Sequence, residues 1–187
     1  CLNLENKMEK IDFYNHNVHI FQCNNTEIYS SNKINESMDY LLNLPLRRPD
    51  EPAGTVLSSV GANFDMSGLP EFYNFYSWLV GQISSINHTF TSNVGNIEFS
   101  RTWVNRMFKH STGNCHTHPD NIDGVAVFYT KIPDNSANLV LVHDDDQLII
   151  PPKEGMLVIH NSDVPHAVSE HLSESPRECI ISEFKIK

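Results

Sequence analysis

Residues 124–150 read GVAVFYTKIPDNSANLVLVHDDDQLII, and this stretch decides the fold class. It holds three short runs that are rich in β-branched and aromatic residues, separated by turn-forming Pro, Asp, Asn and Ser. Similar runs continue on both sides, so the full set is 97–108, 124–131, 138–143, 147–150, 155–160, 164–169 and 178–186. Several short strands at such close spacing are typical of a β-sandwich or barrel. We therefore predict a β core over residues 96–187.

The first half of the chain has a different pattern. Residues 11–22 are rich in β-formers and predict one or two strands. Apolar residues at helical spacing predict helices over 35–44 and over 71–86. The stretch 45–68 is rich in Pro, Gly, Asp and Ser, so it predicts a long loop. The expected fold is mainly β (α+β), with amino-terminal helices packed on the sheet.

Length and composition limit the partners. With 187 residues, 40% of them hydrophobic and 19% charged, the chain is expected to form one soluble domain, 1–187, in which 1–95 supply the strand, helices and loop. The net charge of −10, with Arg47-Arg48 as the only basic pair, argues against a nucleic-acid or anionic-membrane surface. No apolar run of about 18 residues predicts a membrane span. The four cysteines form no C-x-x-C pair and are expected to be reduced thiols in a cytoplasmic protein.

Candidate metal ligands lie in the β half, at His116-Thr117-His118-Pro119-Asp120. Alternate residues of a strand face one side, so His116, His118 and Asp120 are expected to share a face. Pro119 lacks a backbone N–H and favours a strand end. A distant histidine, His166, follows an apolar strand and a short turn and could complete the site. Two imidazoles and a carboxylate with open positions form the facial triad of non-haem Fe(II) oxygenases.

A second cluster, His143-Asp144-Asp145-Asp146, lies between two predicted strands. Adjacent acidic residues in a turn usually diverge, so we interpret this cluster as a solvated hairpin turn rather than a metal site. Cys115 adjoins His116, but neighbouring strand residues point to opposite faces. A catalytic Cys–His pair is therefore not expected there.

These motifs resemble those of the Fe(II)/2-oxoglutarate-dependent oxygenases, whose fold is a double-stranded β-helix, a jelly-roll or cupin-like barrel. The nearer resemblance is to a small group of such oxygenases in marine bacteria and phages. It covers about residues 97–186, half of the chain. The residues that carry it are Trp103-Val104-Asn105, His116-Thr117-His118-Pro119, Gly124-Val125-Ala126-Val127-Phe128-Tyr129, and then Pro152, Gly155, His166 and Arg177.

The resemblance implies Fe(II) as the metal, with 2-oxoglutarate and O2 as cosubstrates. It implies that Arg177 binds the far carboxylate of 2-oxoglutarate, helped by Tyr129 or Asn105. Related enzymes often have Ser or Thr two residues after this arginine, where this chain has Cys179. They also usually have an aromatic residue where this chain has His160.

The resemblance leaves two ligand sets open. The His-x-Asp/Glu…His pattern of the wider superfamily fits His118, Asp120 and His166, and we favour this set because carboxylate triads are common. The spacing in the nearer group instead places the first ligand at His116. His118 then takes the position of the carboxylate, giving three imidazoles.

Two other functions compete with an oxygenase that hydroxylates an unidentified small molecule or peptide. The first is a cupin-type metalloprotein, a three-histidine dioxygenase, isomerase or lyase. It lacks the expected glutamate shortly after His-x-His, because Asn121, Ile122 and Asp123 occupy that stretch. The second is a β-sandwich binding module with structural histidines. We expect no nucleic-acid or membrane partner, and a homodimer stays open.

Overall fold

A computed structural model describes residues 8–44, 56–60, 65–91 and 95–187. Its amino-terminal part comprises β1 (Met8–Phe13), β2 (His16–Gln22), α1 (Asn32–Leu42), β3 (Val56–Ser58) and α2 (Tyr73–Ile86). The strands that follow are β4 (Ile97–Met107), β5 (Gly113–His116), β6 (Gly124–Lys131), β7 (Leu139–His143), β8 (Asp146–Ile150), β9 (Met156–Asn161), β10 (His166–Val168) and β11 (Arg177–Ile186).

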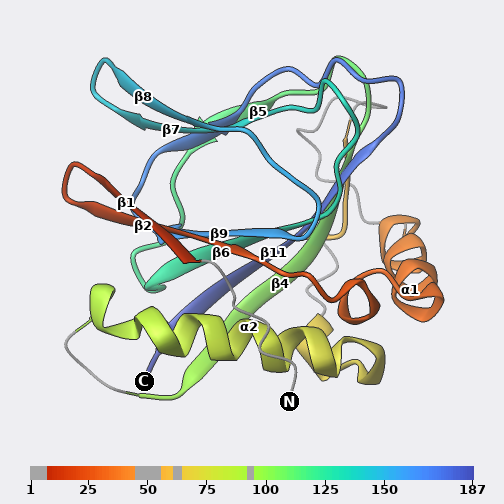
Figure 1. Cartoon of the computed structure of the whole chain (residues 1–187), viewed down its shortest axis with the longest axis horizontal. Coiled ribbons are helices and arrows are strands. Elements are labelled where there is room, and N and C mark those ends of the chain that lie inside the picture. The colour runs from red at the N-terminus through yellow and green to blue at the C-terminus, as the bar shows by residue number, and fades with distance from the viewer. Residues whose placement is uncertain (1–7, 45–55, 61–64, 92–94) are drawn as a thin grey trace.

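The strands form two facing sheets, with orders β1-β2-β9-β6-β11-β4-β3 and β5-β10-β7-β8 (Figure 1). From β4 to β11 the chain passes repeatedly from one sheet to the other, which is the winding of a double-stranded β-helix. This confirms the predicted fold class. The two sheets face each other without closing into one barrel, and β1 and β2 extend the larger sheet beyond the β-helix.

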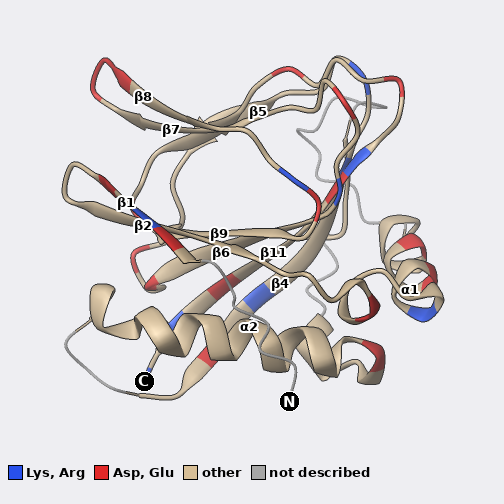
Figure 2. Ribbon diagram, viewed as in Figure 1, with Lys and Arg blue, Asp and Glu red and all other residues tan. Residues whose placement is uncertain are grey.

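The larger sheet separates two apolar layers because side chains alternate along its strands. Helix α2 lies across its outer face and contains no charged residue (Figures 1 and 2). The side chains of Phe75, Leu79 and Ile83 on this helix are fully buried against the sheet. The inner face carries a second cluster between the sheets, which includes Val127 and Val158. The candidate site residues share this inner layer.

The predicted elements of the first half are largely present. The run 11–22 is a β1–β2 hairpin, and the helices fall at α1 and α2. The predicted loop 45–68 is wrong in part, because Val56–Ser58 pairs with β4. Of the rest of that loop, Met66–Gly68 forms a short 3-10 helix, and residues 45–55 and 61–64 lie outside the described residues.

Two predictions in the β half concern the site. The turn that Ser111-Thr112-Gly113-Asn114 predicts from its composition is partly wrong, since Gly113–His116 forms β5 and pairs with β10. His143 and Asp146 flank a tight β7–β8 turn, as predicted for the acidic cluster. No helix in the described ranges is long and apolar enough to cross a membrane. The three cysteines that the structure describes, Cys23, Cys115 and Cys179, are free.

Candidate metal centre

Three histidines meet between the sheets, at the end of β5 and the start of β10. His116 is the last residue of β5 and is the register partner of His166 on β10. Their ring centroids lie 4.4 Å apart, and His118 stacks on His166 with ring centroids 5.1 Å apart. One ligand nitrogen from each of His116, His118 and His166 lies within 4.8 Å of the others. This is the one group of that kind found among the described residues.

The hydrogen bonds of the rings determine which nitrogen faces inward. In His116 and His166, Nδ1 lies 2.8 Å from the Asn114 carbonyl oxygen and 2.9 Å from the Val164 carbonyl oxygen. In His118, Nδ1 lies 2.6 Å from Oε1 of Glu183. Each Nδ1 faces an oxygen that only accepts, so we assign the proton to Nδ1 and a lone pair to Nε2.

The inward nitrogens could share a proton or hold a cation. Nε2 of His118 and Nε2 of His166 are only 3.3 Å apart, and in the assigned tautomers both present lone pairs that suit a cation. Burial, with the neighbouring His160 adding to it, lowers the pKa of His166 to about 2, which keeps its ring neutral. Imidazoles with converging ring nitrogens suit a divalent transition metal. The residues present therefore fit a divalent metal such as the iron that the sequence resemblance implies.

His118 reaches this group from a loop rather than from a strand, so the expected shared strand face is wrong. Strand β5 ends at His116, and the next residues turn toward the β9–β10 connection. There the His118 backbone N–H donates to the Ser162 carbonyl at 2.9 Å. The Ser162 hydroxyl in turn donates to the Ile122 carbonyl at 2.8 Å. Contact between two loops thus places His118, and strand periodicity does not.

Asp120, the fourth residue predicted for the metal, has a different position. It lies two residues beyond His118 and is exposed. It is not a member of the histidine group. The structure therefore brings together the three imidazoles, and Asp120 lies outside them.

Glu183 is a buried carboxylate that sequence reasoning missed. It lies on β11 and receives two hydrogen bonds from Arg101, at 2.6 and 3.0 Å, besides the one from His118. Burial favours a raised pKa, but the His118 and Arg101 hydrogen bonds prevail and hold the pKa of Glu183 below its ordinary value. The available signal was a lone acid in the apolar run CIISEF, on the same strand face as Cys179 and Ile181.

A fourth histidine, His160 on β9, contacts His166 from the larger sheet. Its ring centroid is 4.7 Å from that of His166, and the side chain is fully buried. Its Nδ1 lies 2.8 Å from the Asn161 carbonyl oxygen, while its Nε2 has no hydrogen-bond partner. Burial lowers the pKa of His160 to about 4, so this ring is neutral as well.

The predicted 2-oxoglutarate residues gather at the other end of the inner face. Cys179 on β11 is the register partner of both Asn105 on β4 and Tyr129 on β6. Arg177 precedes Cys179 by two residues, and its guanidinium lies 4.9 Å from the centroid of the Tyr129 ring. The structure thus brings Arg177, Tyr129 and Asn105 together.

This second group has unused polar atoms. Arg177 is 2% exposed, and its Nη1 donates to the sulfur atoms of Met107 and Cys179, at 3.2 and 3.7 Å. Among the described residues no carboxylate forms an ion pair with it. Nε of Arg177, the Tyr129 hydroxyl and Oδ1 of Asn105 are buried without a hydrogen-bond partner. A buried cation and unpaired polar groups are costly unless a ligand completes them.

The electrostatics of this group favour an acidic ligand. Burial raises the pKa of Tyr129 to about 12, and the Arg177 charge opposes that rise. Burial also raises the pKa of the Cys179 thiol. Tyrosine and cysteine therefore stay protonated, and the arginine is the one charge in the group. An anion with hydrogen-bond acceptors suits these donors.

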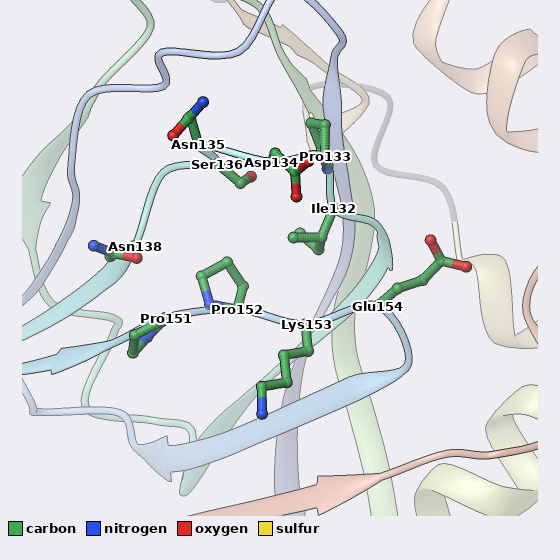
Figure 3. A pocket seen from close by; sticks show the side chains of 10 residues that line it. All are labelled: Ile132, Pro133, Asp134, Asn135, Ser136, Asn138, Pro151, Pro152, Lys153 and Glu154. Atoms are coloured by element: carbon green, nitrogen blue, oxygen red, sulfur yellow. The ribbon is translucent and has the colours of Figure 1, made fainter.

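A separate hollow of about 430 Å³ borders the same end of the sheet (Figure 3). It lies between the β6–β7 and β8–β9 connections and is lined by Ile132, Pro133, Asp134, Asn135, Ser136, Asn138, Pro151, Pro152, Lys153 and Glu154. None of these residues belongs to the histidine group or to the Arg177 group. We assign no ligand to this hollow.

Comparison with known proteins gives results at the level of structure only. The sequence matches no protein-family model, and no curated protein matches it. The solved structure of the non-heme alpha ketoglutarate dependent epimerase SnoN from nogalamycin biosynthesis matches with a TM-score of 0.67 and 11% identity, over 90% of this chain and 77% of that chain. The chain has the fold of the 2OG-Fe(II) oxygenases.

Two further structures support the same fold. A 2OG-Fe(II) oxygenase family oxidoreductase from Burkholderia pseudomallei matches with a TM-score of 0.60 and 14% identity, over 90% of this chain and 84% of that chain. HygX from Streptomyces hygroscopicus, solved with nickel and 2-oxoglutarate bound, matches with a TM-score of 0.59 and 10% identity, over 91% of this chain and 83% of that chain. The 2OG-oxygenase fold thus recurs in neighbours that share little sequence with this chain.

Proposed function

We propose that this protein is a non-haem Fe(II)- and 2-oxoglutarate-dependent dioxygenase that hydroxylates a small molecule or a peptide. The observation that carries the proposal is the convergence of one ligand nitrogen from each of three histidines whose rings are held by hydrogen bonds at Nδ1. In this proposal His116, His118 and His166 hold the metal. Bound Fe(II), with 2-oxoglutarate and O2, would supply the oxidising chemistry, which side chains alone lack.

The chain itself orients the cosubstrate and excludes water. In this proposal Arg177 binds the far carboxylate of 2-oxoglutarate, and the Tyr129 hydroxyl donates to the same group. The Asn105 side chain completes the pocket. The unpaired buried atoms of these residues support the assignment, because a carboxylate would accept from two of them at once. The apolar residues between the sheets keep the reacting centre dry.

We propose the three imidazoles as metal ligands in place of the predicted set of His118, Asp120 and His166. Exposed Asp120 lies outside the histidine group, whereas His116 is in direct ring contact with His166. Three neutral ligands leave the iron with its full double charge. The bound 2-oxoglutarate and the nearby Glu183 would offset that charge.

The first test is anaerobic titration of the apoprotein with Fe(II) and then 2-oxoglutarate. We expect metal uptake, followed by a weak visible charge-transfer band when 2-oxoglutarate chelates the metal. Consumption of 2-oxoglutarate under O2, with succinate as product, would extend the result. No metal uptake at all would refute the proposal and favour a binding module.

The second test separates the two ligand sets. His116→Ala, His118→Ala, His166→Ala and Asp120→Ala are each titrated with Fe(II) or Zn(II) against a chelator. We expect each histidine variant to lose most metal affinity and Asp120→Ala to keep it. The opposite result, in which Asp120→Ala loses the metal and His116→Ala keeps it, would restore the carboxylate triad.

A cupin-type three-histidine dioxygenase is the second candidate, and one observation favours it. All three ligands are imidazoles, a donor set that does not require a keto acid. This candidate gives Arg177 no role. Metal uptake without the charge-transfer band on addition of 2-oxoglutarate would support it.

A further inference from the structure

Glu183 occupies an unusual place for a carboxylate. It lies on the inner face of β11, where the neighbouring inward residues Cys179 and Ile181 are apolar, and its side chain is only 4% exposed. Oε1 of Glu183 is 2.6 Å from Nδ1 of His118. A charge this deeply buried destabilises the fold unless it is paired and hydrogen-bonded.

Arg101 holds the carboxylate in place from the neighbouring strand. The two residues are register partners on β4 and β11, and the guanidinium binds both carboxylate oxygens. The guanidinium also lies 5.0 Å from the centroid of the Trp103 ring, and that ring is 6.3 Å from the His118 ring. Both oxygens are therefore engaged, and Glu183 is fixed beside His118 rather than free to bind the metal itself.

The three histidines differ in the group that accepts a hydrogen bond from Nδ1. Nδ1 of His116 and Nδ1 of His166 face neutral backbone carbonyls, whereas Nδ1 of His118 faces a carboxylate. A carboxylate that accepts from Nδ1–H fixes the ring orientation and raises the basicity of Nε2. His118 is therefore expected to be the strongest donor of the three, with negative charge directly behind it.

We propose that Glu183 is a positioning residue that supplies, through His118, the negative charge that a carboxylate ligand would bring to the metal. The inference rests on the proposed three-histidine site and deepens it. Arg101 orients Glu183 and keeps it out of the metal's coordination positions. The site thus combines neutral ligands with a carboxylate one hydrogen bond away.

The same two strands offer a matched control. Glu178 and Arg106 are also register partners on β11 and β4, and Nε of Arg106 donates to Oε1 of Glu178 at 3.0 Å. The side chain of Glu178 is 10% exposed, so it is nearly as buried as that of Glu183, but its hydrogen-bond partner is Arg106 and not a histidine. Glu178→Gln therefore removes a comparable carboxylate–arginine pair without touching the site.

The experiment compares wild type, Glu183→Gln and Glu178→Gln. Co(II) and Zn(II) affinities are measured by chelator competition, and the visible spectrum is recorded at saturating Co(II). We expect Glu183→Gln to lose metal affinity by about 10- to 100-fold and to shift the Co(II) bands. The Fe(III)/Fe(II) potential should also rise, because lost negative charge favours Fe(II). Glu178→Gln should match wild type in all three readouts.

The outcomes separate this inference from the proposed function. If wild type binds metal and Glu183→Gln equals Glu178→Gln in affinity, spectrum and potential, the role of Glu183 is refuted while the metal site stands. If wild type binds no metal, both proposals fail. Should Glu183→Gln not fold, Arg101→Gln decides, since freeing the carboxylate from the guanidinium should change the Co(II) spectrum and weaken Co(II) binding relative to wild type. An unchanged spectrum there would equally refute the role.

Discussion

The two ends of the inner face of the larger sheet are built differently. At the histidine end, Nδ1 of each of the three clustered rings has an acceptor, and Nε2 of His118 lies 3.3 Å from Nε2 of His166. At the Arg177 end, buried polar atoms of three residues have no partner. One end is thus oriented in advance, and the other is incomplete without a ligand.

This difference matches the hydrogen-bonding and coordination groups that each ligand brings. A metal needs only lone pairs, and orienting the rings beforehand lowers the cost of binding. A carboxylate brings its own acceptors, so its pocket must keep donors unused. The protein accepts the destabilisation of unused donors at the Arg177 end, as functional sites commonly do.

The largest expected effect separates the two ends through Arg177. In Arg177→Met, 2-oxoglutarate binding to the metal-loaded protein should weaken at least a hundredfold, about 3 kcal/mol, because a buried carboxylate loses its cation. Metal affinity should be unchanged. Isothermal titration of the apoprotein with Ni(II), and of the Ni(II)-loaded protein with 2-oxoglutarate, measures the two affinities. Lys131→Met, which removes an exposed charge at the end of β6, is the control and should bind as wild type. Equal loss of metal affinity in Arg177→Met would show that the two ends are not independent.

The second prediction concerns the stability of the histidine end without metal. His118→Ala should lower the free energy of unfolding by about 1–3 kcal/mol, because buried Glu183 loses a hydrogen bond. His116→Ala should cost less than about 0.5 kcal/mol, since that residue is exposed. Urea unfolding with a chelator present gives both values. Equal costs would mean that Glu183 finds another donor.

A third prediction uses a buried histidine that serves neither end. His19 on β2 is 1% exposed, its Nε2 contacts the Thr89 hydroxyl at 3.0 Å and its Nδ1 is unpaired. Burial, then the charges of Lys10 and His88, lower its pKa to about 4, while Asp12 acts in the opposite direction. The unfolded chain therefore takes up a proton between pH 6.5 and about 4 that the folded chain does not.

Stability should accordingly fall as the pH drops through that window, and His19 should account for about 3 kcal/mol of the loss. In His19→Phe, unfolding measured by urea at pH 7 and pH 4 should show a smaller difference than in wild type. Metal and 2-oxoglutarate affinities at pH 7 should not change. Altered ligand binding in this variant would mean that an unpaired buried atom affects the site from a distance.

The smallest expected effect tests the unused donor at the Arg177 end. Tyr129→Phe should leave the ligand-free stability unchanged or slightly raise it, because the hydroxyl has no partner there. It should weaken 2-oxoglutarate binding by about fivefold to tenfold, close to 1 kcal/mol. Thermal unfolding and the same calorimetric titration provide the two numbers. A clear loss of ligand-free stability would show that the hydroxyl is already satisfied.

Much of the fold could be predicted because its signals are local. The strand runs from 97–108 to 178–186 and the apolar stripe of α2 depend on residues only a few positions apart. Strand β5 was missed because Gly113 and Asn114 resemble a turn. Those residues are in a strand because β10 pairs with them. Strand β3 was also missed, because its three residues are in a strand only through their pairing with β4.

The sequence by itself determined the chemistry available to this protein. Its spacing singled out His116, His118, Asp120 and His166, and the family resemblance added Arg177. Only the tertiary structure decided how those side chains meet. Loop contact at Ser162 places His118, and the β4–β11 register places Arg101 against Glu183 behind it. Such contacts join residues 44 to 82 positions apart, and their free energy depends on packing that no local pattern encodes.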